Sequence, residues 1–178
     1  MIDAGYFAKH IVTRPEWLEA AGVDEICSVS HCVSRDPDGW IGRWQHNGFG
    51  WFDRPADALA AVPSGERDRF RLFAYRVHPL VFRGSGQSVL VVPHDVRPEP
   101  IPGEFASLGF DSASKSMESI LGFECSPLSC NSMAVELRVN RYCLFASFDE
   151  AIAGARRFAA EQPEPGDYYV IEVLERRR

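Results

Sequence analysis

Apolar and polar residues along the chain alternate in ways that predict both strands and helices. Strands are expected at 26–33, 70–77, 88–92, 139–145 and 168–174, and helices at 14–22, 53–62 and 147–160. The runs 70–77 and 168–174 carry apolar side chains on both faces, which is typical of strands inside a sheet. The pattern therefore predicts a single α+β domain over 1–178, with a mixed or antiparallel sheet and two or three packed helices.

Local signals refine the ends of these elements. Ser147 is followed three residues later by Glu150, a capping box that begins a helix, and Asp53 can cap the helix before it. Four prolines within 93–103 favour an extended connection. The serine-rich segment 107–119 is expected to be a loop or a weak helix.

Two cysteine segments share the frame C-S-x-x-x-C: Cys27–Cys32 and Cys125–Cys130. Each is followed by an aromatic stretch containing an asparagine, Asn47 or Asn140, and then by a predicted helix and strand. The repeated order predicts two pseudo-repeated strand–helix–strand halves, 23–83 and 122–175. Few positions are identical between the halves, so chance similarity is the alternative.

Composition and charge narrow the classes of function. The chain has 178 residues, 46% hydrophobic and 25% charged, which is ordinary for a soluble globular protein that needs no metal or disulfide to fold. A net charge of −6 argues against a nucleic-acid partner. We expect no membrane partner and a cytoplasmic location, because the sequence shows neither an apolar run of spanning length nor a signal peptide.

The cysteines are expected to be thiols, because their number, five, is odd and the cytoplasm is reducing. Both cysteine pairs are C-x4-C. Residues five apart point to opposite faces of a strand and diverge on a helix, so the pairs suit convergent metal ligands poorly. We expect no metal and no cofactor.

A cysteine nucleophile is the chemistry that the sequence suggests most directly. Cys125 and Cys130 flank a polar loop that we expect near the surface, and His31 or His46 could serve as the base. The alternative is structural: the loop's polar side chains bond its own backbone while the thiols pack inward. The residues that could instead bind a ligand or partner are Ser126, Ser129, Asn131 and, from an aromatic cluster that could be core or contact surface, Trp44.

The chain also resembles a family of uncharacterised bacterial proteins. The resemblance rests on Trp17-Leu18, on the Cys27 segment, on His46-Asn47-Gly48 and above all on E-C-S-P-L-S-C-N at 124–131, followed by N-R-Y-C at 140–143. It implies a bacterial cytosolic protein and attaches no activity, cofactor or catalytic residue.

Three hypotheses of function follow. The first is a non-enzymatic protein-interaction or immunity-type module, favoured by small size, acidic charge and the lack of a catalytic motif. The second is a small enzyme that uses a cysteine in the 125–131 loop. The third is a small-molecule-binding domain with a pocket between the halves. A partner protein is possible under the first hypothesis, and the sequence does not set the oligomeric state.

Overall fold

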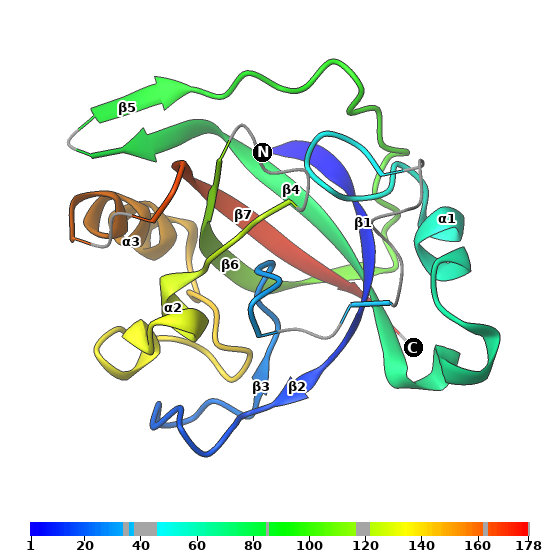
Figure 1. Ribbon diagram of the computed structural model, residues 1–178, viewed down its shortest axis with the longest axis horizontal. Helices are drawn as coiled ribbons and strands as arrows, with labels where there is room; N and C mark the ends of the chain where they lie inside the picture. Colours follow the sequence, from blue (N-terminus) through cyan, green and yellow to red (C-terminus); the bar gives the residue numbers. More distant parts are fainter. Residues whose placement is uncertain (34–35, 38–45, 85, 117–121, 162–163, 178) are drawn as a thin grey trace.

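A five-stranded antiparallel sheet forms the centre of the computed structural model, which describes residues 1–33, 36–37, 46–84, 86–116, 122–161 and 164–177 (Figure 1). Its strand order is β1-β4-β7-β6, and β5 pairs with the far end of β4. The strands are β1 (Ile2–His10), β4 (Phe70–Arg83), β5 (Gly86–Val89), β6 (Phe105–Lys115) and β7 (Asp167–Arg176). The predicted α+β class with an antiparallel sheet is confirmed.

Short helices and a small hairpin complete the fold. The hairpin pairs β2 (Val12–Thr13) with β3 (Glu25–Ile26). The α-helices are α1 (Pro55–Ala60), α2 (Pro127–Cys130) and α3 (Phe148–Glu161), and 3-10 turns lie at Ser64–Arg69 and Met133–Val135. Helices α1 and α3 lie at opposite ends of the sheet in Figure 1. No helix in the described part of the chain is both long and apolar enough to span a membrane.

The inner strands β4 and β7 form the centre of the core. Tyr75 lies opposite Val173 and Val77 opposite Ile171, and all four are buried. Side chains on both faces of these strands are buried, as the apolar runs at 70–77 and 168–174 predict. Both predicted strands are confirmed, and β4 continues to Arg83.

Two turns, each built around an asparagine, are joined to the outer strands of the sheet by side-chain hydrogen bonds. Asn47 Nδ2 donates to the Ala4 carbonyl of β1 at 3.0 Å, and Asn140 Nδ2 donates to the Leu108 carbonyl of β6 at 2.7 Å. In each turn the asparagine Oδ1 accepts from the backbone amides two and four residues further on. The two turns therefore use the same contacts. These contacts extend to β1 and β6, which lie largely outside the expected halves 23–83 and 122–175, and the duplication itself stays a prediction.

Two predicted elements in the first half are wrong. The segment 14–22 is not a helix but the connection of the β2–β3 hairpin, closed by a 3.0 Å bond from the Arg14 amide to the Asp24 carbonyl. The predicted strand 26–33 contributes only its first residue to β3, because buried side chains and not a neighbouring strand bind the backbone of 28–30.

Two further predictions fail in the second half. The serine-rich segment 107–119 forms most of β6, which pairs with β7 along its length, and the buried Ser112 Oγ donates to the Ala151 carbonyl at 3.0 Å. The predicted strand 139–145 is instead the Asn140 turn, in which Cys143 has a positive φ of 58°. The aromatic stretch 40–45 lies outside the described residues.

The capping box of α3 is present, and it leads to a stability prediction. Ser147 Oγ accepts from the Glu150 amide at 3.3 Å, and Glu150 Oε2 accepts from the Ser147 amide at 3.0 Å. Ser147→Ala should lower the free energy of unfolding by about 1 kcal/mol, because an amide of the first helical turn loses its acceptor. Chemical denaturation measures the change. The matched control is Ser88→Ala on the exposed strand β5, and equal losses in the two variants would contradict the capping role.

Candidate functional site

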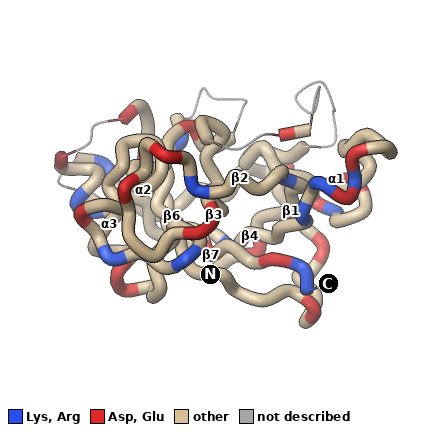
Figure 2. Tube along the Cα trace, turned by 90° about the horizontal axis from the view of Figure 1, so that it is seen from below, with Lys and Arg blue, Asp and Glu red and all other residues tan. Residues whose placement is uncertain are grey.

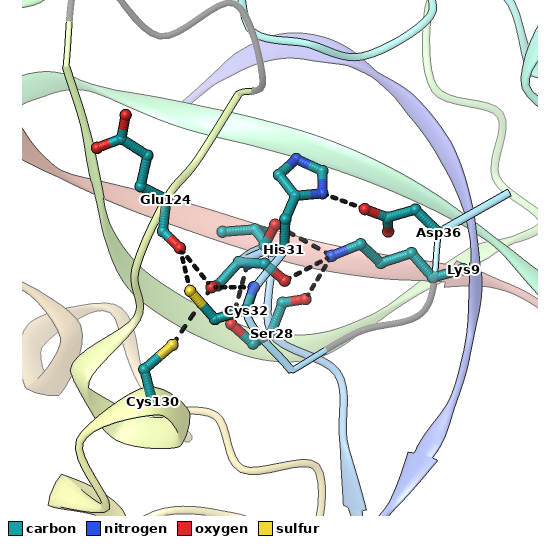
Figure 3. Close-up of polar contacts among 9 residues, drawn as sticks. Lys9, Ser28, His31, Cys32, Asp36, Glu124 and Cys130 are labelled. Atoms are coloured by element: carbon teal, nitrogen blue, oxygen red, sulfur yellow. Dashed lines mark hydrogen bonds and ion pairs between the residues drawn. The ribbon is translucent and has the colours of Figure 1, made fainter. Parts of the chain in front are cut away.

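The path of the first cysteine segment is set by a buried lysine. Lys9 extends from β1 and is only 3% exposed. Its ammonium nitrogen donates to the backbone carbonyls of Ser28, Val29 and Ser30 at 3.0, 3.0 and 3.1 Å (Figure 3). These three bonds match the three donors of an ammonium group. The Lys9 side chain thus takes the place of a neighbouring strand as the hydrogen-bond donor to this segment.

A buried carboxylate joins the two cysteine segments. Asp111 on β6 is 0% exposed. Its Oδ2 accepts from Ser28 Oγ at 2.8 Å and from the Val29 amide at 2.9 Å. Its Oδ1 accepts from Ser126 Oγ at 2.6 Å and from the Ser112 amide at 2.8 Å. The two serines occupy the second position of the two C-S-x-x-x-C frames, so Asp111 fixes both frames to the same strand.

Three thiols meet beside this network and form, together with Ser30, what we call the thiol site. Cys32 Sγ donates to the Glu124 carbonyl at 2.9 Å, and both Cys32 and Cys125 interact with the Cys130 sulfur. Ser30 Oγ lies 3.4 Å from the same sulfur. Cys125 is 7% exposed, Cys130 is half-buried and Cys32 is exposed. The Cys130 sulfur therefore lies between a buried thiol and an accessible one.

These interactions shift the pKa values of the three thiols in different directions. The bond from Cys125, and then those from Ser30, the Ser126 backbone and Cys32, lower the pKa of Cys130 to about 6 against the opposing effect of burial. The pKa of Cys125 is raised, because its thiol donates to Cys130 and because it is buried. Burial also raises the pKa of Cys32. Of the three thiols, Cys130 is the one whose pKa is lowered, and this favours its thiolate form.

The predicted histidine bases lie away from the sulfurs. His31 Nδ1 bonds the Asp36 carboxylate, and its ring packs edge-on against Phe7 with centroids 5.9 Å apart. Burial lowers the pKa of His31. Figure 3 shows its ring on the opposite side of the segment from Cys130. His46 pairs with Phe52, and none of the hydrogen bonds described connects either histidine with a cysteine.

The other predicted residues divide into structural and exposed positions. Ser126 is buried against Asp111, and Ser129 Oγ donates to the Ser126 carbonyl at 3.4 Å. Asn131 donates to Glu164 at 3.2 Å on the surface. Trp44 lies outside the described residues. Ser129 thus bonds the segment's own backbone, as the structural alternative expected, whereas Ser126 bonds Asp111 of β6. The predicted loop is wrong for 127–130, which form α2, and Cys130 at its end is half-buried.

Four residues of the site were not assigned to it from sequence: Lys9, Ser30, Cys32 and Asp111. Lys9 has a signal, since it is one of only two lysines in the chain and stands within an apolar run. Asp111 has a weaker one, a lone charge among small residues. Neither signal indicates which segment the side chain binds, because that depends on contacts across the sheet.

The thiols do not form a metal-binding set. Among the residues that the structure describes, no three His, Cys, Asp or Glu side chains are placed to hold one metal ion. The chain matches no protein-family model, no curated protein and no solved structure. Its function must therefore be argued from the thiol site itself.

Proposed function

We propose that the protein is a redox-active thiol protein in which Cys130 reacts as a thiolate and Cys32 is the second thiol. The observation that carries the proposal is the convergence of two further thiols, Cys32 and Cys125, and the Ser30 hydroxyl on the Cys130 sulfur, from segments far apart in the chain. A cysteine buried only for packing needs no such partners. The site thus favours the cysteine hypothesis over a purely structural loop.

The reaction that fits is thiol–disulfide exchange. The Cys130 thiolate attacks an external disulfide such as oxidised glutathione, forming a mixed disulfide and releasing one external thiolate. Cys32 then loses its proton and attacks the Cys130 sulfur, which releases the second external thiolate. The product is a Cys32–Cys130 disulfide and two reduced external thiols. Cys125 is less suited to this second step, because it is buried and donates to Cys130.

We propose a cytoplasmic location, because reduced glutathione there would restore both thiols. Reversibility requires that the oxidised pair be reducible there. Cys32 is exposed, so an external thiol can reach it. A site of this kind would respond to the redox state of its surroundings without a bound cofactor.

Oxidised glutathione is expected to convert the native protein to a form with a Cys32–Cys130 disulfide. Peptide mapping without reduction identifies the bond. Cys27 and Cys143 should stay reduced, because both are buried and burial raises the pKa of each to about 12. Reduced glutathione in excess should reverse the reaction.

Two variants provide the controls. Cys32→Ser should stop at a mixed disulfide on Cys130, whereas Cys130→Ser should take up no glutathione at the site. Alkylation of Cys130 in the wild type should rise through a midpoint near pH 6, in line with its lowered pKa and well below the ordinary thiol value of about 8.5. If Cys130 reacts only on global unfolding, the proposed function is wrong.

The other two hypotheses stay predictions. Binding to another protein has one supporting feature, the exposed apolar side chains of Val89, at the end of the edge strand β5, and of Val91, two residues after it, which are 72% and 86% exposed. Ligand binding between the halves has a cavity of about 350 Å³ between the β4–β5 hairpin and Arg156 of α3. Neither feature brings reactive groups together.

A further inference from the structure

We propose that Lys9 is a positioning residue for the thiol site: its buried ammonium fixes the backbone of 28–30 and thereby sets Ser30 and Cys32 against the Cys130 sulfur. The inference rests on the proposed function, since it gives Lys9 a role in the reactivity of Cys130. Lys9 touches none of the three sulfurs. Figure 3 shows its side chain approaching the segment from the side opposite Cys130.

The hydrogen bonds require Lys9 to be charged. Three carbonyl oxygens accept from its nitrogen. A neutral amine has two N–H groups and a lone pair, so the lone pair would face one of these carbonyls. Burial lowers the pKa of Lys9, and the nearby acidic groups, Asp36 first, oppose this effect. The three carbonyl acceptors therefore favour the charged form of Lys9 in the interior of the protein.

The link from Lys9 to the sulfur passes through Ser30. The Ser30 carbonyl binds Lys9, while the Ser30 hydroxyl donates to the Glu124 carbonyl at 2.8 Å and lies 3.4 Å from the Cys130 sulfur. The Cys32 amide donates to the same hydroxyl at 3.1 Å. Fixing the backbone of Ser30 thus fixes two of the groups that surround Cys130.

The positive charge of Lys9 and its position both favour the thiolate form of Cys130. The interaction between Lys9 and Cys130 favours the charged form of each. The titratable groups that interact electrostatically with Lys9 are Asp36, Asp111, Cys27 and, as a neighbouring base, His31. Those that interact with Cys130 are Cys32, Cys125, Cys143 and Tyr168. Glu164 also acts on Cys32 and Cys125. Lys9 is the one lysine among the groups named here. Replacing it would leave the Cys130 thiolate surrounded by acidic groups and other thiols.

The first test compares the chain's two lysines. Lys9→Met should raise the pH midpoint of Cys130 alkylation and slow alkylation at neutral pH by about threefold or more, since less thiolate is present. Lys115→Met is the matched control, because Lys115 is also buried, at the end of β6, and should leave the midpoint unchanged. A purely structural Lys9 would lower stability without moving the midpoint, and that result overturns the inference.

The second test needs no change at Lys9, so it holds even if Lys9→Met fails to fold. In protein labelled with ¹⁵N-lysine, Lys9 should give an ammonium signal protected from solvent, assigned with Lys115→Met. That signal should shift at the midpoint of Cys130 ionisation in the wild type and stay constant in Cys130→Ser. A neutral amine signal, or no shift in the wild type, overturns the inference. The two proposals can be told apart. If the Lys9 signal shifts with Cys130 ionisation and Lys9→Met raises the alkylation midpoint, but no Cys32–Cys130 disulfide forms, the proposed function is wrong and the positioning role of Lys9 stands.

Discussion

Replacing Asp111 by alanine is expected to lower the free energy of unfolding by about 3–5 kcal/mol, because the change breaks a buried charged network from one side. The hydroxyls of Ser28 and Ser126 and the amide of Val29 would lose their acceptor in the interior. Each unsatisfied buried group costs about 1–3 kcal/mol. Lys9 would also lose a nearby opposite charge. Denaturant unfolding under reducing conditions measures the loss.

Two further variants separate this network from a general effect of removing a charge. Asp68→Ala, at an exposed position, should change stability by less than about 0.5 kcal/mol. Ser126→Ala removes one donor and leaves the carboxylate three others, so its cost should be about 1 kcal/mol. An Asp111→Ala protein as stable as the Ser126→Ala protein would show that the carboxylate does not hold the two cysteine segments together.

Each of the two cysteine segments carries a structural residue and a reactive residue. Figure 2 places α2 and the β2–β3 hairpin on one side of the strands, so both segments pack on the same face. Asp111 holds the serine of each frame, while the sulfurs of Cys32 and Cys130 lie towards the surface. Stability and reactivity thus depend on different atoms of the same short segments. A serine variant and a cysteine variant should therefore give different phenotypes.

Sequence patterns predicted the elements whose signals are local. The runs 70–77 and 168–174 became the inner strands because a strand buried on both faces has apolar residues at successive positions. The helix 147–160 became α3 because its capping box and apolar stripe act within one element. The predicted helix 53–62 is present as the shorter α1, but the predicted Asp53 cap is wrong: Arg54 precedes the helix, and Asp53 Oδ1 accepts from Asn47 Nδ2 instead.

The thiol site escaped prediction because its determinants lie far apart in the chain. Residues 28–30 carry a strand-like sequence, yet their backbone partners are side chains from Lys9 and Asp111. Ser112 of β6 resembles a loop residue in the sequence, yet its hydroxyl is buried and donates to the Ala151 carbonyl of α3. The sequence pattern did identify Cys125 and Cys130, because the polar segment between them is unusual, although that segment forms α2 and not the expected loop. It assigned them a histidine base, whereas the structure surrounds Cys130 with thiols and a serine.

The two asparagine turns depend on glycines that let the outer strands approach closely. Gly5 and Gly109 sit at the irregularities of β1 and β6, with φ of 142° and 135°. A Cβ on Gly109 would lie 2.5 Å from the Phe145 carbonyl oxygen and 2.7 Å from Asn140 Nδ2. Both atoms are fixed, the first in the backbone and the second by its bond to the Leu108 carbonyl. No side chain can move aside to make room.

Gly109→Ala should therefore lower the free energy of unfolding by about 3 kcal/mol, since strain at positive φ adds to a clash with fixed atoms. Gly103→Ala is the matched control: no atom lies within 4 Å of its added methyl, and it should be neutral or slightly stabilising. Thermal and denaturant unfolding of both variants give the comparison. The Gly109 variant should also weaken the Asn140 turn, seen as faster hydrogen exchange at the Tyr142 and Leu144 amides. Equal stability of the two variants, with unchanged exchange, would mean that β6 can shift to admit a methyl group and that this close approach is not required by the fold.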